Sequence, residues 1–250
     1  MEYTMNPVIK ALYDRKSVRA YLDKPLSEAE QNQIIDAAIQ APSAGNQIFY
    51  TILHIEDQKI KNQLAVLCDN QPFIAAAPFV LIFLADCRRW LDGYVYAGID
   101  ACKPGQGDIL LACEDAAIAA QNAVTAADSL GIGSCYIGDI LENKEKVSTL
   151  LNLDEYVLPI TMVVFGYPTK QQTERQKPKR FNKKYIVRKN TYSRMEKDEM
   201  TEMFKEVHTE KGFDYTEYMK GFYTRKYMSD FSREMTRSVH EYLAAFKSSK

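Results

Sequence analysis

The stretch DILLACEDAAIAAQNAVTAADSL, residues 108–130, is the longest helical pattern in the chain. It is rich in alanine and apolar on almost every side, and a helix without a polar face is normally buried in a core or against another subunit. Its small side chains also let a second backbone approach closely, which favours a position near a dimer axis. Gly131 follows and supplies the left-handed residue that ends a helix.

A continuous apolar run from Phe79 to Ala85 is typical of a buried central strand. The helical patterns and about four strand patterns do not alternate as regular strand–helix–strand units, so the sequence predicts the α+β class. Residues 90–106 show little periodicity and are expected to form an irregular connection. The other expected helices begin at Asn6-Pro7 and at the capping box Ser27–Glu30, or lie over residues 57–67 and 144–151. Strands are expected over 49–55 and 160–165, and a short turn or strand over 134–140.

The chain turns polar and basic from Tyr167 to Asn190, which indicates an arm or long loop rather than a core element. The last sixty residues have mostly helical patterns, and a final helix is expected near 229–247. We therefore expect a core over residues 1–190 and a helical C-terminal extension over 191–250.

The composition excludes several classes of protein. With a formal net charge of −1, no overall basic field would attract nucleic acid or an acidic membrane. The apolar runs reach only strand length, and the first residues do not resemble a signal peptide, which predicts a cytoplasmic protein without a membrane span. Five scattered cysteines form no CxxC pair and three histidines lack zinc spacing, so we expect reduced thiols and no metal.

Three segments carry residues that could bind a ligand, and each also has a purely structural explanation. Arg15-Lys16-Ser17-Val18-Arg19 offers the cationic donors and hydroxyl that an organic phosphate requires, or is a basic helix end that offsets the helix dipole. Ala41–Gln47 brings small and amide side chains near a planar ligand, or simply ends a helix. Residues 177–181 form a second cationic cluster, or a solvated charge run.

The segment Gly131–Gly138 has the spacing GxGxxxxG, which differs from the dinucleotide fingerprint GxGxxG. It also follows a helix, whereas that fingerprint follows a strand. No GxxxxGK[ST] phosphate loop occurs in the chain. A Rossmann domain and a P-loop ATPase are therefore excluded, and a helix cap with a glycine turn explains the segment taken alone.

Taken in order, these segments resemble the nitroreductase and flavin reductase family, in particular its branch of NADPH-preferring, oxygen-insensitive major nitroreductases. The most specific similarity runs from Ala120-Gln121-Asn122-Ala123 to Tyr136-Ile137-Gly138. Arg15–Arg19 is similar to the family's basic-x-Ser-x-basic opening, and Lys177-Pro178-Lys179 to a Lys-Pro-Arg segment that holds the cofactor phosphate. The resemblance covers nearly the whole chain.

The resemblance implies a central mixed, mainly antiparallel sheet of about four to five strands flanked by helices, in an intertwined homodimer. FMN would bind across the subunit interface to the core of residues 1–190, and the C-terminal extension would pack on the dimer and the pocket. Turnover would be ping-pong, with hydride passing from NADPH, or NADH, through FMN to nitroaromatics, quinones or flavins. Because the flavin performs the redox chemistry, no catalytic side chain is required.

The same resemblance assigns cofactor contacts to particular residues. The expected phosphate contacts are Arg15, Ser17, Lys177 and Lys179, with Lys16 in the same motif as Arg15 and Ser17. The expected ring contacts are Arg19 and Gln71 at the pyrimidine edge and Gly138 at N5. Tyr136 and Ile137 are expected along the ring, and Ser43 and Asn46 at the opposite edge. For the phosphates of the nicotinamide nucleotide, the candidates are Lys220 and Arg225.

Two departures from the family pattern bear on function. Lys179 stands where the family has arginine, so a bidentate grip on phosphate is lost unless Arg180 replaces it. Ala44-Gly45 stands where many members carry serines, which alters the pocket and its acceptors. Two alternatives stay open: a flavin reductase that supplies free reduced FMN to a partner oxygenase, and a flavin-binding module without turnover.

Overall fold

The computed structural model describes residues 6–247. The chain divides into two compact units: one comprises the chain up to Arg175 and again from Glu234, and the other comprises Gln176–Arg233. The first unit contains the sheet, and the second is helical. The boundary between the two compact units lies at residue 176, and the chain enters the first unit again at Glu234. The division at residue 190 into a cofactor-binding core and a C-terminal extension stays a prediction.

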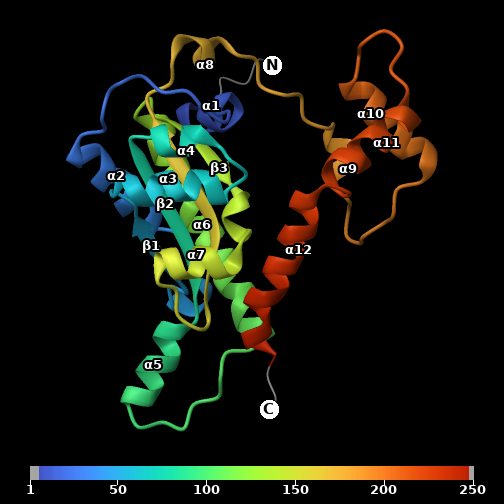
Figure 1. Cartoon of the computed structure of the whole chain (residues 1–250). Helices are drawn as coiled ribbons and strands as arrows, with labels where there is room; N and C mark the ends of the chain where they lie inside the picture. Colours follow the sequence, from blue (N-terminus) through green and yellow to red (C-terminus); the bar gives the residue numbers. More distant parts are fainter. Residues whose placement is uncertain (1–5, 248–250) are drawn as a thin grey trace. The chain divides into compact units, whose positions relative to one another are not determined.

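The first unit is built on a four-stranded sheet in the order β1-β2-β4-β3, with all neighbours antiparallel (Figure 1). A parallel bridge between Ser17 and Ser134 adds a mixed edge beside β3. β2 is central and almost wholly buried, which confirms the predicted central strand and the α+β class. The strands are β1 Tyr50–His54, β2 Phe79–Asp86, β3 Gly133–Ile137 and β4 Val157–Gly166.

The alanine-rich stretch forms α6, Gln106–Ser129, which packs against α2, β2 and β4. Its alanines lie on the face toward the sheet, where their small size lets the helix axis approach closely, and Gly131 ends it with a φ of 73°. The outer side of α6 exposes the apolar side chains of Leu110, Leu111 and Ile118, beside the polar Glu114 and Gln121.

The predicted caps are confirmed. Asn6 caps α1, Pro7–Asp14, and Ser27 and Glu30 form the reciprocal capping box of α2, Glu28–Ile39. Further helices of the first unit are η1 Ala44–Asn46, α3 Gln58–Leu67, α4 Pro72–Ala76, α5 Arg88–Tyr96, η2 Gly138–Leu141, α7 Lys144–Leu151, α8 Lys170–Glu174 and η3 Ala244–Phe246.

The prediction of an irregular connection over residues 90–106 is wrong in its first half, because Arg88–Tyr96 forms the helix α5. Arg88 and Asp92 form an i,i+4 ion pair along it, with 2.7 Å between Nε and Oδ1. Trp90 anchors its inner side by donating its indole N–H to the carbonyl of Gln47 at 2.7 Å. Residues 99–105 have no regular structure, as expected.

The predicted helical C-terminal region is confirmed. The second unit contains α9 Lys183–Ile186, α10 Lys197–Val207 and α11 Tyr215–Lys226. Aromatic contacts of Phe204 with Tyr215 and Tyr218 join α10 to α11. α12, Asp230–Leu243, ends in the first unit, where Ser238 accepts from the amide of Lys144 at 2.9 Å. Within residues 6–247, no helix is both long and apolar enough to cross a membrane.

Candidate functional site

The basic segment that follows α1 lies along the edge of β3. Val18 donates its amide to the carbonyl of Ser134 at 2.9 Å, next to the Ser17–Ser134 bridge. A Cβ on Gly133 would lie 2.6 Å from Val18, so only glycine permits this approach. The sequence-predicted donors at residues 15–19 are therefore fixed beside the strand that leads to Gly138.

Arg15 is the residue of this segment whose surroundings best fit an anionic ligand. Its guanidinium carbon lies 5.8 Å from the centre of the Tyr136 ring. Its Nη1 is buried and has no hydrogen-bond partner among the described residues. Buried donors are normally paired, and a guanidinium is suited to phosphate oxygens. The arrangement therefore fits a bound organic phosphate.

Lys16 is engaged with the α8 region rather than directed to open space. Its ammonium donates to the carbonyl of Thr173 at 2.6 Å and to the carbonyl of Arg175. The Arg175 guanidinium in turn donates to the carbonyl of Ser17, and the buried Gln172 accepts from the amide of Arg19 at 3.2 Å. Sequence reasoning missed Gln172 and Arg175, because only the general polarity of this segment marked them.

Arg19 connects the basic segment to α4. Its guanidinium carbon lies 5.8 Å from the centre of the Phe73 ring, two residues beyond Gln71. Gln71 immediately precedes α4 and donates its side-chain amide to the carbonyl of Cys68 at 2.9 Å. The structure thus brings the predicted arginine and the segment of the predicted glutamine to the same side of the sheet.

Gly138 opens the far end of β3. Ile137 is buried in the core, whereas Gly138 is exposed, and no heavy atom of the described chain lies within 4 Å of a Cβ built on it. Tyr136 is partly buried and donates its hydroxyl to Gln121 at 3.2 Å. Free space beside the backbone at Gly138 is what a flat ligand would need.

Glu142, the residue that follows η2, is a buried carboxyl group close to three other carboxylates. Glu142 is 6% exposed, and its Oε1 has no hydrogen-bond partner among the described residues. Burial, together with repulsion from Asp139, Asp69 and Glu234, raises the pKa of Glu142 to about 7. This carboxyl group therefore holds its proton up to near neutral pH.

We expect this proton to make stability depend on pH. The pKa of Glu142 in the folded state lies above its ordinary value of 4.5. The protonated carboxyl group therefore contributes fully to the free energy of unfolding below pH 4.5, and this contribution is lost as the pH rises through about 7. From about pH 6 to about pH 8.5, the free energy of unfolding should fall by about 1–2 kcal/mol. Urea unfolding at several pH values measures this fall. Glu142→Gln should remove most of it, while the control Glu145→Gln should keep it. Equal pH profiles for wild type and Glu142→Gln would contradict the prediction.

The loop of Ser43 and Asn46 is organised by Asp115, which sequence reasoning missed. This buried carboxylate on α6 accepts from the Ser43 hydroxyl at 2.6 Å and from the amides of Ala44 and Phe49 at 2.9 and 3.1 Å. The only sign in the sequence is an acidic residue on the alanine face of the helix. Asn46 has a φ of 56°, a left-handed conformation that asparagine tolerates.

One chain does not bring this loop together with the basic segment. β1 starts beyond the loop, and its Tyr50 pairs with Ala85 at the end of β2. Ser134, beside the basic segment, pairs with Phe165, which pairs with Phe79 at the start of β2. Phe79 and Ala85 are six residue steps apart along β2, a distance of about 20 Å.

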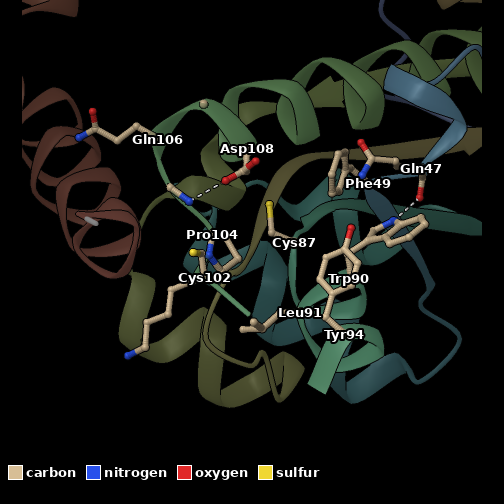
Figure 2. A pocket seen from close by; sticks show the side chains of 13 residues that line it. Gln47, Phe49, Cys87, Trp90, Leu91, Tyr94, Cys102, Pro104, Gln106 and Asp108 are labelled. Atoms are coloured by element: carbon tan, nitrogen blue, oxygen red, sulfur yellow. Dashed lines mark hydrogen bonds between the residues drawn. The ribbon is translucent and has the colours of Figure 1, made fainter. Parts of the chain in front are cut away.

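A cavity of about 460 Å³ lies beside the same loop (Figure 2). Phe49, Trp90 and Tyr94 form an aromatic wall, and the N-terminal end of α6 faces it. Burial raises the pKa of Cys87, which lines this cavity, to about 12, so its thiol is not a nucleophile at neutral pH. Among the described residues, no group of His, Cys, Asp and Glu could hold a metal ion.

The remaining predicted residues belong to the second unit. Lys179 donates to the Thr209 hydroxyl at 3.2 Å, and Lys220 pairs with Glu217 at 2.8 Å. Arg225 lies in the last turn of α11. The assignment of Lys177 and Lys179 to a phosphate, and of Lys220 or Arg225 to the nicotinamide nucleotide, stays a prediction.

Residues 12–167 match the model of the nitroreductase family. The chain belongs to this family. It is 31% identical to the FMN reductase [NAD(P)H] of Bacillus subtilis (strain 168), over 95% of this chain and 91% of that protein. It is 35% identical to the oxygen-insensitive NADPH nitroreductase of Salmonella typhimurium, over 66% and 67% of the two chains. The solved structure of B. megaterium NfrA2 is similar with a TM-score of 0.78 and 28% identity, covering 98% of this chain and 100% of that one.

Proposed function

We propose that this chain is an NAD(P)H-dependent FMN oxidoreductase that reduces small electron-poor acceptors. The observation that carries the proposal is the buried Nη1 of Arg15, which has no hydrogen-bond partner in residues 6–247 and lies beside a strand that ends in the open backbone at Gly138. A phosphate group and a flat ring are the two halves of FMN. The names of the relatives, an FMN reductase and an NADPH nitroreductase, support the same chemistry.

Arg15 and Ser17 hold the FMN phosphate. Arg19 provides positive charge at the pyrimidine edge, where Gln71 can both donate and accept hydrogen bonds. The backbone at Gly138 lies against the ring, and Tyr136 and Ile137 shape the strand that precedes it. When bound, FMN supplies the hydride transfer itself, so this chain contributes grip, orientation and electrostatics rather than a nucleophile or base.

A homodimer completes the site. Ser43 and Asn46 lie about 20 Å along the sheet from Ser17, so one chain cannot place both groups at one flavin, whereas a two-fold partner can supply its own loop. Exposed apolar side chains on α6, including Leu110 and Leu111, offer a surface for that partner. The nicotinamide and then the acceptor use the same open face in a ping-pong sequence.

A second candidate, supply of free reduced FMN, is favoured by the similarity to the FMN reductase over 95% of this chain. The two functions differ in the preferred second substrate. Steady-state rates with free FMN, a quinone and a nitroaromatic would separate them, because a flavin reductase would use FMN most efficiently.

Purified protein reconstituted with FMN should be yellow, and its flavin absorbance should bleach when NADPH or NADH is added without oxygen. Stopped-flow reduction by each nucleotide, followed by mixing with the acceptors, gives both half-reactions. A protein that takes up no FMN, or whose bound FMN is not reduced by either nucleotide, would contradict the proposed function.

Gly138→Val tests where the ring lies. A Cβ at this position has no heavy atom within 4 Å apart from its chain neighbours, so we expect stability to stay within about 0.5 kcal/mol of wild type. FMN affinity should fall by about tenfold, because the branches would occupy the ring's space. Fluorescence titration of FMN and thermal unfolding of the apoprotein measure the two effects. Unchanged affinity would place the ring elsewhere.

A further inference from the structure

A second cavity, of about 830 Å³, lies on the first unit between the segment Arg19–Pro25 and the α3–α4 region. Its inner wall carries Lys61 of α3. Among the residues that line this cavity, only Arg19 is assigned to the cofactor. The other charged side chains of the lining, Asp23, Lys24 and Lys61, have no role in the proposed function.

Lys61 is unusual because it is a cation with only 7% of its surface exposed. Among the described residues, its ammonium has one hydrogen-bond partner, the carbonyl of Ala77 at 3.3 Å, and forms no ion pair. Burial lowers the pKa of Lys61, and the more distant Glu56 only partly opposes this. An ammonium has three N–H donors, and a buried charge without a counter-ion is costly. The side chain is therefore poised to receive an anion.

The rest of the cavity defines the kind of anion. Three of its lining residues are cations, Arg19, Lys24 and Lys61, against the one carboxylate of Asp23. Between them the wall is mostly apolar, formed by the Phe73 ring together with prolines and alanines. A fully hydrated inorganic anion would leave this apolar wall in contact with water. An organic anion would bury the wall under its apolar part and still pair its charge with the Lys61 ammonium.

We propose that this cavity binds a small organic monocarboxylate, whose carboxylate pairs with Lys61 and whose apolar body lies against Phe73 and the neighbouring alanines. The carboxylate replaces the weak contact to Ala77 with charge-assisted hydrogen bonds. This site is formed by residues of one chain and is separate from the phosphate contact of Arg15 and from the open backbone at Gly138.

The test uses the full chain saturated with FMN and benzoate as the probe, with benzamide as its neutral analogue. Calorimetric titration should show binding of benzoate and at least tenfold weaker binding of benzamide. Lys61→Met should weaken benzoate by at least tenfold, while Lys59→Met, on the exposed side of the same helix, should not change it. Equal benzoate affinity in the two variants, or no binding by wild type, would overturn the proposal.

A second measurement needs no variant. Acetic anhydride labels accessible amines, and peptide mass spectrometry reports the rate at each lysine. Benzoate should slow the labelling of Lys61 and leave Lys59 unchanged; equal effects on both would overturn the proposal. Flavin absorbance, recorded in the same samples, separates this outcome from the proposed function, because loss of FMN binding would not alter a cavity made by the chain alone.

Discussion

Arg15→Met should weaken FMN binding by about 10- to 100-fold without destabilising the apoprotein. The guanidinium has a buried Nη1 with no partner among the described residues, so its removal eliminates a charge-assisted contact to phosphate but breaks no contact of that atom within the chain. Relieving an unsatisfied buried donor can even raise stability slightly. Fluorescence titration of FMN and thermal unfolding of the apoprotein check the two halves of the prediction.

The matched control is Lys10→Met, which removes a cation of α1 that is exposed and paired with Asp14. It should leave FMN affinity unchanged. The effect of Arg15→Met should also shrink for riboflavin, which lacks the phosphate. An equal loss of affinity for riboflavin and FMN would show that Arg15 does not hold the phosphate, and a destabilised apoprotein would show that its role is structural.

Much of the fold could be predicted from local patterns, because the relevant signals are local. The capping box of Ser27 and Glu30, the apolar run of β2 and the alanine face of α6 each depend on neighbouring residues, and the structure confirms all three. The helix at Arg88–Tyr96 was missed because its stability depends on distant contacts, including the bond from Trp90 to the loop before β1.

The candidate site was only partly predictable for a related reason. A motif such as Arg15–Arg19 names donors, but which of them remain available depends on residues far away in the sequence. Lys16 donates to the carbonyls of residues 173 and 175, while the buried Nη1 of Arg15 has no partner in the part of the chain that the structure describes. Sequence spacing also cannot show that Ser43 lies at the opposite end of the sheet, because that follows from strand register.

Asp115→Ala should produce the largest loss of stability, about 3–5 kcal/mol. The buried carboxylate of Asp115 accepts three hydrogen bonds, from Ser43, Ala44 and Phe49. Alanine would leave these three donors without their acceptor. For a chain of this size, the loss corresponds to a decrease in melting temperature of about 6–20 °C. Glu114→Ala, at the exposed neighbouring position of the same helix, should change the melting temperature little.

Asp115→Asn separates the structural role of this residue from its effect on the proposed cofactor site. Asparagine keeps one acceptor oxygen, so the loop of Ser43 should stay partly ordered and the loss of stability should be smaller, about 1–3 kcal/mol. If a partner's loop completes the flavin site, FMN affinity should still fall in this folded variant, although Asp115 lies far along the sheet from Arg15. A stable variant with wild-type FMN affinity would instead show that the loop is structural alone, and that the flavin is bound without the partner's Ser43 and Asn46.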